Sequence, residues 1–317
     1  MAALNNLACA SNVANVGFGT CYLDLKQIVG AIIVPNGYEL TSGELASLQA
    51  SLVADSKAAN KLSRIYPIHK IVGVTANTEE KTVQTFSTGA KAVVREGKYD
   101  WTFQFVEGGL CLSNALRSFN SNGAWSILFY DEKYVLFGKK GSTAGSLYGI
   151  PTNYLWAQPF TPNDGSNTAI YAVNVVFNPE YINEQLGYVQ ATSTIEDVKG
   201  LQDVNITVNS WVEATGVANV TVMTDCGTNL GEVYPTELVD ADVWIANNAS
   251  TGAAITVSTR AYVSSTKTFN ITVDTADSDF PSGTQGVLLN VAANSVLEAN
   301  GIVGFESSGA VTLPTTA

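Results

Sequence analysis

Apolar residues recur along the chain in short runs whose spacing favours β-strands over helices. Residues 28–34 are apolar or small throughout and end at a Pro-Asn-Gly turn signal, which predicts a strand buried on both faces. In residues 99–105 every second position is aromatic and the positions between are polar. This period of two predicts a strand with one buried face. The aromatic positions are Tyr99, Trp101, Phe103 and Phe105.

More strands follow in the first 200 residues. Residues 124–130 and 134–138 flank Asp-Glu-Lys, a short polar tip that predicts a β-hairpin. Residues 169–177 again have the composition of a strand, whereas the segment 138–168 is rich in glycine, serine and asparagine and is predicted to be mostly loop. Residues 1–27 are small and polar and predict an N-terminal arm.

Helical spacing is confined to two places. Thr41 and Glu44 form a capping-box pattern, and leucines recur at helical spacing after it, which predicts a helix from residue 41 to about residue 59. The apolar stripe of this helix is narrow, so we expect it to lie on a sheet. A second, short helix is predicted over residues 112–119.

The segment 190–203 has little apolar content and is the predicted boundary between an assembly domain, residues 28–195, and a second domain, residues 200–317. Seven short strand-like runs follow it, a number typical of an immunoglobulin-like (Ig-like) sandwich. We therefore predict a mainly β protein, with an antiparallel sandwich or barrel-forming domain, one or two flanking helices, and an Ig-like β-sandwich. The seven runs are 204–212, 219–224, 243–246, 254–263, 268–275, 286–291 and 302–305.

Charge is sparse and uneven. Charged residues make up 14% of the chain, against about a quarter in an ordinary soluble domain, which suits a surface that neighbours cover. Residues 1–200 hold 14 Lys and Arg against 16 Asp and Glu, a net charge of −2; residues 201–317 hold 2 against 12, a net charge of −10. Neither half has the basic face that binding to nucleic acid phosphates requires.

The N-terminal residues hold no lysine or arginine before Lys26, so we expect no secretory leader, and no apolar run has the roughly 20 residues of a membrane span. Four scattered cysteines are then expected to be free thiols. Four Asn-X-Ser/Thr sequons are interpreted as strand composition and not as glycosylation sites. The cysteines are Cys9, Cys21, Cys111 and Cys226, and the sequons begin at Asn205, Asn219, Asn248 and Asn270.

The sequence contains few candidate catalytic residues. His69, the only histidine, lies among apolar residues with no serine, cysteine or acid at motif spacing, so we expect a structural or surface histidine. The adjacent acids Glu79-Glu80 and Asp131-Glu132 point to opposite faces of an extended chain and are poor carboxylate pairs. We predict no catalytic residues, no cofactor and no enzymatic activity.

Three further sequence patterns could in principle bind a ligand, but a structural role is favoured for each. Asp274, Asp277 and Asp279 could hold calcium, but the glycine and final glutamate of an EF-hand loop are absent, and an acidic connecting loop is favoured. Gly-Lys-Lys-Gly-Ser-Thr from Gly138 lacks phosphate-loop spacing. The aromatics of residues 99–105 could stack on bases, but their alternation favours a sheet core. We therefore expect no metal site, and whether the acidic loop holds calcium stays open.

The segments Asn-Thr-Glu-Glu-Lys-Thr-Val-Gln-Thr-Phe-Ser-Thr-Gly (residues 77–89) and Val-Arg-Glu-Gly-Lys-Tyr-Asp-Trp-Thr-Phe-Gln-Phe (94–105) resemble virion structural proteins of tailed bacteriophages, most closely tail tube proteins. The similarity continues through Tyr-Gly-Ile-Pro (148–151) and Asn-Asp-Gly-Ser-Asn (163–167) and covers about residues 25–190. Residues 200–317 resemble bacterial-type Ig-like modules. The resemblance implies subunits that assemble into six-membered rings, with strands lining a common lumen.

From this resemblance we expect a tail tube subunit whose rings stack into a conduit for the genome. Its partners would be its own copies and other tail proteins, with DNA passing through without specific binding and with no membrane contact. It would assemble in the host cytoplasm and reside in the virion tail. A capsid decoration, tail-terminator, ring or connector protein is an alternative. A carbohydrate-binding surface protein is the alternative from another class, and it would need exposed aromatic residues.

Overall fold

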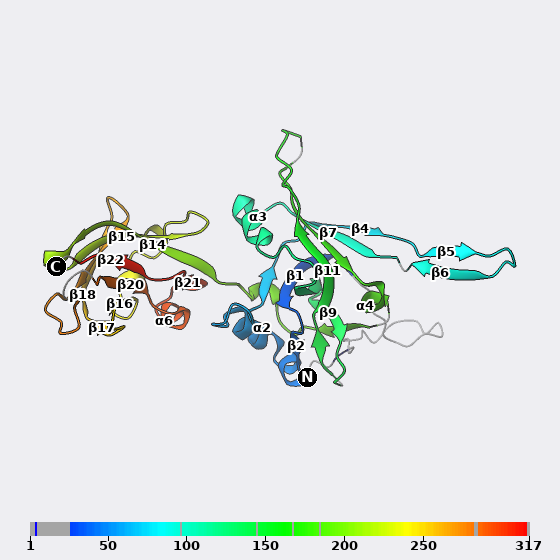
Figure 1. Cartoon of the computed structure of the whole chain (residues 1–317), viewed down its shortest axis with the longest axis horizontal. Helices are drawn as coiled ribbons and strands as arrows, with labels where there is room; N and C mark the ends of the chain where they lie inside the picture. Colours follow the sequence, from blue (N-terminus) through cyan, green and yellow to red (C-terminus); the bar gives the residue numbers. More distant parts are fainter. Residues whose placement is uncertain are drawn as a thin grey trace. The chain divides into compact units, whose positions relative to one another are not determined.

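The computed structural model describes Leu4 and residues 26–95, 97–143, 145–166, 168–183, 185–281 and 285–315. The predicted N-terminal arm, apart from Leu4, Lys26 and Gln27, lies outside the described residues. The chain divides into two compact units, Met1–Gly200 and Leu201–Ala317, which are called unit 1 and unit 2 below. It is mainly β, with antiparallel sheets and few helices, as the sequence predicted (Figure 1).

Unit 1 is built on one large sheet. Its strands follow the order β2-β10-β9-β8-β11-β12-β7-β4, while β1 pairs with β8 and β3, and β13 pairs with β9. All of these pairings are antiparallel. The strands are β1 (Ile28–Pro35), β2 (Glu39–Leu40), β3 (Tyr66–Ile68), β4 (Gly73–Thr78), β7 (Tyr99–Phe105), β8 (Trp125–Asp131), β9 (Val135–Lys140), β10 (Leu147–Tyr148), β11 (Ile150–Ala157), β12 (Tyr171–Phe177) and β13 (Leu186–Gln190).

The predicted strands at residues 28–34, 99–105, 124–130, 134–138 and 169–177 are confirmed. β1 is buried on both faces because alternate residues enter two different cores: Ile33 packs with the aromatics of β7 and β12, whereas Ile32 packs under the helices. On β7, Phe103 and Phe105 are buried, and Tyr99 and Trp101 pack against the same core, so the predicted buried face is confirmed.

Two helices, α1 (Ser42–Ala46) and α2 (Leu48–Ser56), cover the second core of unit 1. Thr41 caps α1 with the predicted capping box, but the expected single helix is interrupted at Ser47 before α2. Ser51 Oγ donates hydrogen bonds to the carbonyls of Glu44 and Ser47, so a side chain competes for carbonyls of the helical ladder at this point. Two further helices are α3 (Gly109–Arg117) and α4 (Pro179–Asn183).

The segment 138–168 differs from the predicted loop because it contains β10 and β11. In β11 the burial alternates, with Leu155 and Ala157 in the core and Trp156 facing outward, and β12 pairs with residues 152–157. The strand is therefore held by its pairing with β12, although the glycine, proline and asparagine content of the segment predicted a loop.

Unit 2 has two sheets that enclose a core of its own. The sheet orders are β18-β19-β15-β14-β21 and β17-β16-β20-β22. Strands occupy six of the seven positions predicted for this unit. The seventh, predicted at residues 302–305, is shifted and corresponds to β21. The strands and helices are β14 (Gln202–Val212), β15 (Val217–Thr224), α5 (Leu230–Val233), β16 (Trp244–Asn248), β17 (Ala254–Ile255), β18 (Val257–Val263), β19 (Thr268–Val273), β20 (Val287–Val291), α6 (Asn294–Ala299), β21 (Phe305–Ser307) and β22 (Val311–Leu313), with short 3-10 turns η2 (Glu213–Thr215) and η3 (Glu237–Val239). A further 3-10 turn, η1 (Ile195–Asp197), lies at the end of unit 1.

Candidate self-association surface

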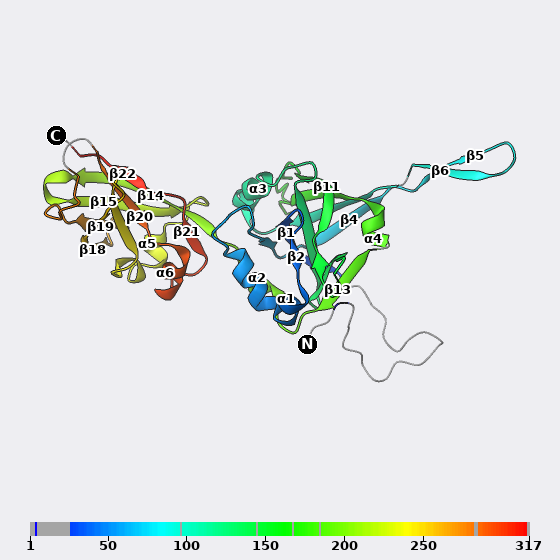
Figure 2. The ribbon, with the colours of Figure 1, turned by 60° about the horizontal axis from the view of Figure 1, so that its bottom comes forward.

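The most conspicuous feature of unit 1 is a long β-hairpin that continues from β4 and β7 and projects away from the sheet (Figures 1 and 2). It consists of β5 (Thr82–Thr85) and β6 (Lys91–Arg95), which pair with each other and form a separate two-stranded sheet. Every residue of both strands is exposed. We call residues 79–98 the hairpin arm.

The base of the hairpin arm is held by local contacts. Arg95 forms an ion pair with Glu79 at 2.9 Å, and the Glu79 amide donates to the Lys98 carbonyl. Gly97 is required here because a Cβ at this position would lie 1.8 Å from the Glu79 carbonyl oxygen. The tip closes through a hydrogen bond from the Phe86 amide to the Ala90 carbonyl.

The hairpin arm exposes large apolar side chains. Val83 and Val93 are paired across the two strands and are 47% and 51% exposed, and Phe86 and Val94 are 46% and 62% exposed. An isolated two-stranded hairpin is marginally stable in water, and its unpaired outer edges invite pairing with another chain. The hairpin arm is therefore the described surface that gains most from being covered.

A second exposed aromatic surface lies on β11. The rings of Tyr154 and Trp156 stack at 5.8 Å between centroids, and Trp156 is 42% exposed. Across the strand pairing, Trp156 lies opposite Asn174, whose amide donates to Asp100 and to Thr102. This surface was not predicted, because the composition of residues 138–168 favoured a loop.

His69 follows β3 directly and is partly buried. Its Nε2 is 2.7 Å from the Val198 carbonyl oxygen and its Nδ1 is 2.6 Å from the Tyr130 hydroxyl. Burial lowers the pKa of His69 below the ordinary value of 6.5, against opposing contributions from the Val198 carbonyl and from Glu196 and Asp197. Neither of its hydrogen bonds joins it to a nucleophile or a carboxylate.

The paired acids are separated by the fold. Asp131 is fully buried at the end of β8, where Oδ1 accepts from the amides of Lys133 and Val135 and so closes the β8–β9 turn. Its neighbour Glu132 is exposed. Glu79 is engaged at the base of the hairpin arm with Arg95. These carboxylates stabilise turns.

The acidic loop of unit 2 is also engaged in turn formation. Asp274 Oδ1 accepts from the Ala276 amide, while Asp277 accepts from the amides of Thr256 and Asp279. These hydrogen bonds lower the pKa of the Asp277 carboxyl, the one from Asp279 contributing most. Within the part of the chain that the structure describes, no three His, Cys, Asp or Glu side chains are grouped to hold a metal ion.

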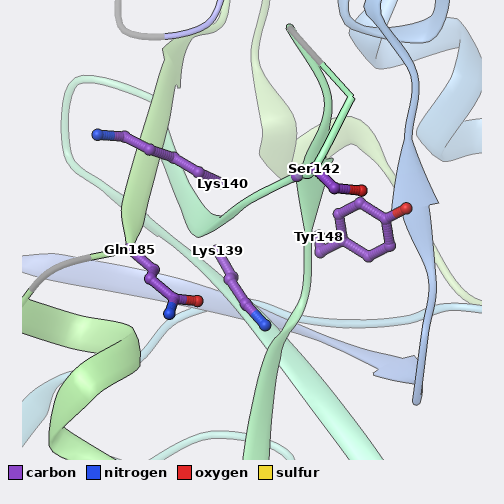
Figure 3. Close-up of a pocket in the computed structure, with 6 residues that line it drawn as sticks. Lys139, Lys140, Ser142, Tyr148 and Gln185 are labelled. Carbon is purple, nitrogen blue, oxygen red and sulfur yellow. The ribbon is translucent and has the colours of Figure 1, made fainter.

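The segment that begins at Gly138 lines a shallow pocket of about 520 Å³ (Figure 3). Lys139 Nζ lies 4.5 Å from the centre of the Tyr181 ring, and the Tyr148 hydroxyl donates to Glu39. Figure 3 shows Lys140 pointing away from Lys139 and Tyr148. Because the two amines diverge, the pocket lacks the converging donors of a phosphate site.

Three of the four sequons lie in sheet strands of unit 2. In each, asparagine and threonine share one face of a strand while the apolar residue between them points to the other, so the pattern follows from the period of two. Asn219 donates to the side-chain oxygen of Asn270 at 2.7 Å and accepts from Asn209. These amides form a hydrogen-bonded ladder across the sheet.

The expectation of free thiols is wrong for the two cysteines within the described residues. Cys111 in α3 and Cys226 after β15 are both disulfide-bonded. Cys9 and Cys21 lie outside the described residues. The expectation rested on a reducing compartment, and the sequence spacing held no local pair to contradict it.

Among the described residues, no helix has both the length and the apolar character needed to cross a membrane. Comparison with known proteins does not assign the chain to a family, because it matches no protein-family model, no curated protein and no solved structure.

Proposed function

We propose that this protein is a structural subunit of a tailed-bacteriophage virion, and more specifically a tail tube subunit that associates with its own copies in stacked rings. The observation that carries the proposal is the hairpin arm, which presents Val83, Phe86 and Val93 to solvent on a two-stranded ribbon separate from the large sheet. The sequence resemblance over about residues 25–190 supplies the class of protein.

The partner that fits the hairpin arm is a second copy of the chain. The hairpin arm holds four basic residues and three acidic ones, a net charge of +1, whereas the rest of residues 1–200 carries −3, so charge does not oppose docking of the arm on unit 1 of another copy. An arm that docks on a different surface of the next copy makes a head-to-tail contact, and such contacts close into rings when the rotation permits.

The low charge of unit 1 agrees with this function. A net charge of −2 over residues 1–200 leaves little repulsion between neighbouring copies. A neutral or acidic lumen would not bind DNA phosphates, so the genome would slide through it. A decoration, tail-terminator, ring or connector role uses the same self-association and differs in what the rings attach to.

A carbohydrate-binding surface protein is the second candidate, and the stacked pair of Tyr154 and Trp156 favours it. Flat aromatic rings beside amide and carboxylate groups, here Asn174 and Asp100, suit the apolar face and the hydroxyls of a sugar. This candidate does not account for the hairpin arm.

The test is negative-stain electron microscopy of the purified full-length chain beside light scattering over a range of concentrations. The triple variant Val83→Thr, Phe86→Ser, Val93→Thr removes the apolar contact of the hairpin arm and keeps its strand composition. The matched control is Leu62→Ser, which removes an apolar side chain that is 80% exposed outside the hairpin arm.

We expect rings or tubes from the wild type and from Leu62→Ser, and monomers with an unchanged melting temperature from the triple variant. Wild-type protein that stays monomeric at every concentration contradicts the proposal. Glycan binding by such monomers, lost in Trp156→Ala, would establish the second candidate.

A further inference from the structure

The exposed large apolar side chains of unit 1 lie mainly at the two ends of one sheet, in which β11, β12, β7 and β4 are neighbours in that order. At one end Thr78 pairs with Tyr99, and β4 and β7 continue from there into the hairpin arm (Figure 1). Among the described residues of unit 1, only Leu62 and Trp156 belong to neither end. The hairpin arm exposes Val83, Phe86, Val93 and Val94.

The opposite end of the sheet exposes four more large apolar side chains, which we call the α3 end. They are Val72, Val106, Leu110 and Phe160. Val72 directly precedes β4, Val106 directly follows β7, and Leu110 lies in the first turn of α3. Phe160 follows β11 and stacks on Tyr171, the first residue of β12, which pairs with the last residue of β7. The strand pairing therefore places all four at the same end of the sheet.

The two ends cannot meet within one chain. The six residues of β4, about 20 Å of strand, separate the α3 end from the base of the hairpin arm. The hairpin arm then continues away from the sheet, with α3 on the far side (Figures 1 and 2). A contact that covers both apolar surfaces at once must therefore join two copies of the chain.

The two ends are also complementary in charge. Residues 81–95 of the hairpin arm hold three basic residues and no acidic one. Residues 106–112 and 157–170 supply three of the four side chains of the α3 end, and they hold two acidic residues and no basic one. In α3 the first basic residue, Arg117, comes about two turns after Leu110.

One charge at each end is paired within its own chain. Arg95 pairs with Glu79 in the hairpin arm, and Glu107 pairs with Lys70, which lies beside the α3 end. Both pairs are exposed, and exposed ion pairs add little stability because water screens them. These side chains can therefore exchange partners across a contact at little cost.

We propose that the hairpin arm of one copy docks on the α3 end of the next copy. This inference rests on the proposed function, because it names the surface that the hairpin arm covers in the assembly. The apolar side chains of Val83, Phe86 and Val93 pack on those of the α3 end, and the basic residues of the hairpin arm lie beside its acidic segments. Each copy then offers one hairpin arm and one α3 end, and such a contact closes into a ring when the rotation permits.

Charge favours this contact over the two symmetric ones. Two hairpin arms that dock on each other would bring basic strands together, and two α3 ends would bring acidic segments together. Like charges that face each other across an interface suppress association. Only a hairpin arm on an α3 end joins opposite charges.

The test mixes two variants of the full-length chain. The arm variant is the triple variant described above, Val83→Thr, Phe86→Ser, Val93→Thr. The α3-end variant is Val72→Thr, Val106→Thr, Leu110→Gln, and it retains Phe160 because that ring stacks on Tyr171. Sedimentation velocity measures the size of each variant alone and of an equimolar mixture, and Leu62→Ser is again the matched control.

We expect each variant alone to be monomeric and the mixture to form a dimer and nothing larger. The α3-end variant supplies the intact hairpin arm, the arm variant supplies the intact α3 end, and no second contact can form. Leu62→Ser should assemble as the wild type does. The inference is overturned if the α3-end variant assembles like the wild type, as it would through contacts between hairpin arms, or if the two monomeric variants stay monomeric when mixed.

These outcomes are distinct from failure of the proposed function, in which the wild type itself stays monomeric at every concentration. If the melting temperature of the α3-end variant falls below that of the wild type, the single variant Leu110→Gln replaces it, because this side chain is exposed on a helix. It should raise the concentration at which half of the protein is assembled by about tenfold, the factor expected for one leucine that leaves an apolar contact. An unchanged concentration would overturn the inference.

Discussion

Replacing Phe103 with alanine should destabilise unit 1 far more than changing its neighbour Thr102. Phe103 is 1% exposed in the middle of β7, and the Trp101 ring lies against it edge-on at 6.3 Å. Truncating a buried phenylalanine removes its transfer free energy and leaves a cavity, at a cost of about 3–5 kcal/mol. A typical domain has only about 5–15 kcal/mol of stability to lose.

Thr102 is the matched control because it lies next in the same strand and faces the other way. Its hydroxyl accepts a hydrogen bond from Asn174 at 3.3 Å, and Asn174 also donates to Asp100. Thr102→Ala therefore leaves the amide of Asn174 with a partner. Its cost should be at most about 1 kcal/mol, most of it lost strand propensity.

Calorimetry of the full-length chain measures both variants. For a unit of this size each kcal/mol shifts the melting temperature by about 2–4 °C, so Phe103→Ala should lower the transition of unit 1 by roughly 6–20 °C and Thr102→Ala by at most about 4 °C. Unit 2 has its own core and supplies an unshifted internal reference. Equal shifts for the two variants would refute the assignment of the buried face and make the aromatics of β7 a contact surface.

Two further predictions concern single positions. Gly30→Ala should sharply lower the yield of folded protein, because the added Cβ would lie 2.1 Å from the Tyr130 ring. Gly43→Ala, whose added Cβ would have its nearest neighbour atom at 3.9 Å, should be neutral or slightly stabilising. Thermal melts of both variants check this, and a Gly30→Ala melt equal to that of the wild type would show that the Tyr130 ring can move. Cys111 and Cys226 should resist alkylation without a reductant and react after reduction, as measured by peptide mass spectrometry, and modification of either before reduction would contradict their disulfide-bonded state.

Most of the strands could be predicted from the sequence because their patterns are local. The period of two in β7 and the apolar run of β1 each report how the strand packs, and the capping box at Thr41 fixes where a helix begins. The interruption at Ser47 was missed because it depends on which carbonyls the hydroxyl of Ser51 bonds to. That competition leaves no periodic signal.

The hairpin arm and residues 191–200 were predicted less well. The hairpin arm consists of strands with no buried face, so the alternation that reveals a strand is weak there. Residues 191–200 have the composition of a linker, but Ile195 and Val198 are buried in the core of unit 1. Composition reports the average polarity of a segment, whereas docking depends on two or three positions.

The division of the cores bears on which part of the chain the proposed self-association would need. Among the described residues, the core of unit 2 is formed by residues between Val204 and Leu313, and both cores of unit 1 are formed by residues of unit 1, with Ile195 and Val198 completing the second. The hairpin arm is an extension of the unit 1 sheet. A chain that ends at Gly200 therefore keeps the complete apparatus proposed for assembly, whereas one that ends at Gln190 loses two buried side chains beneath α1 and α2.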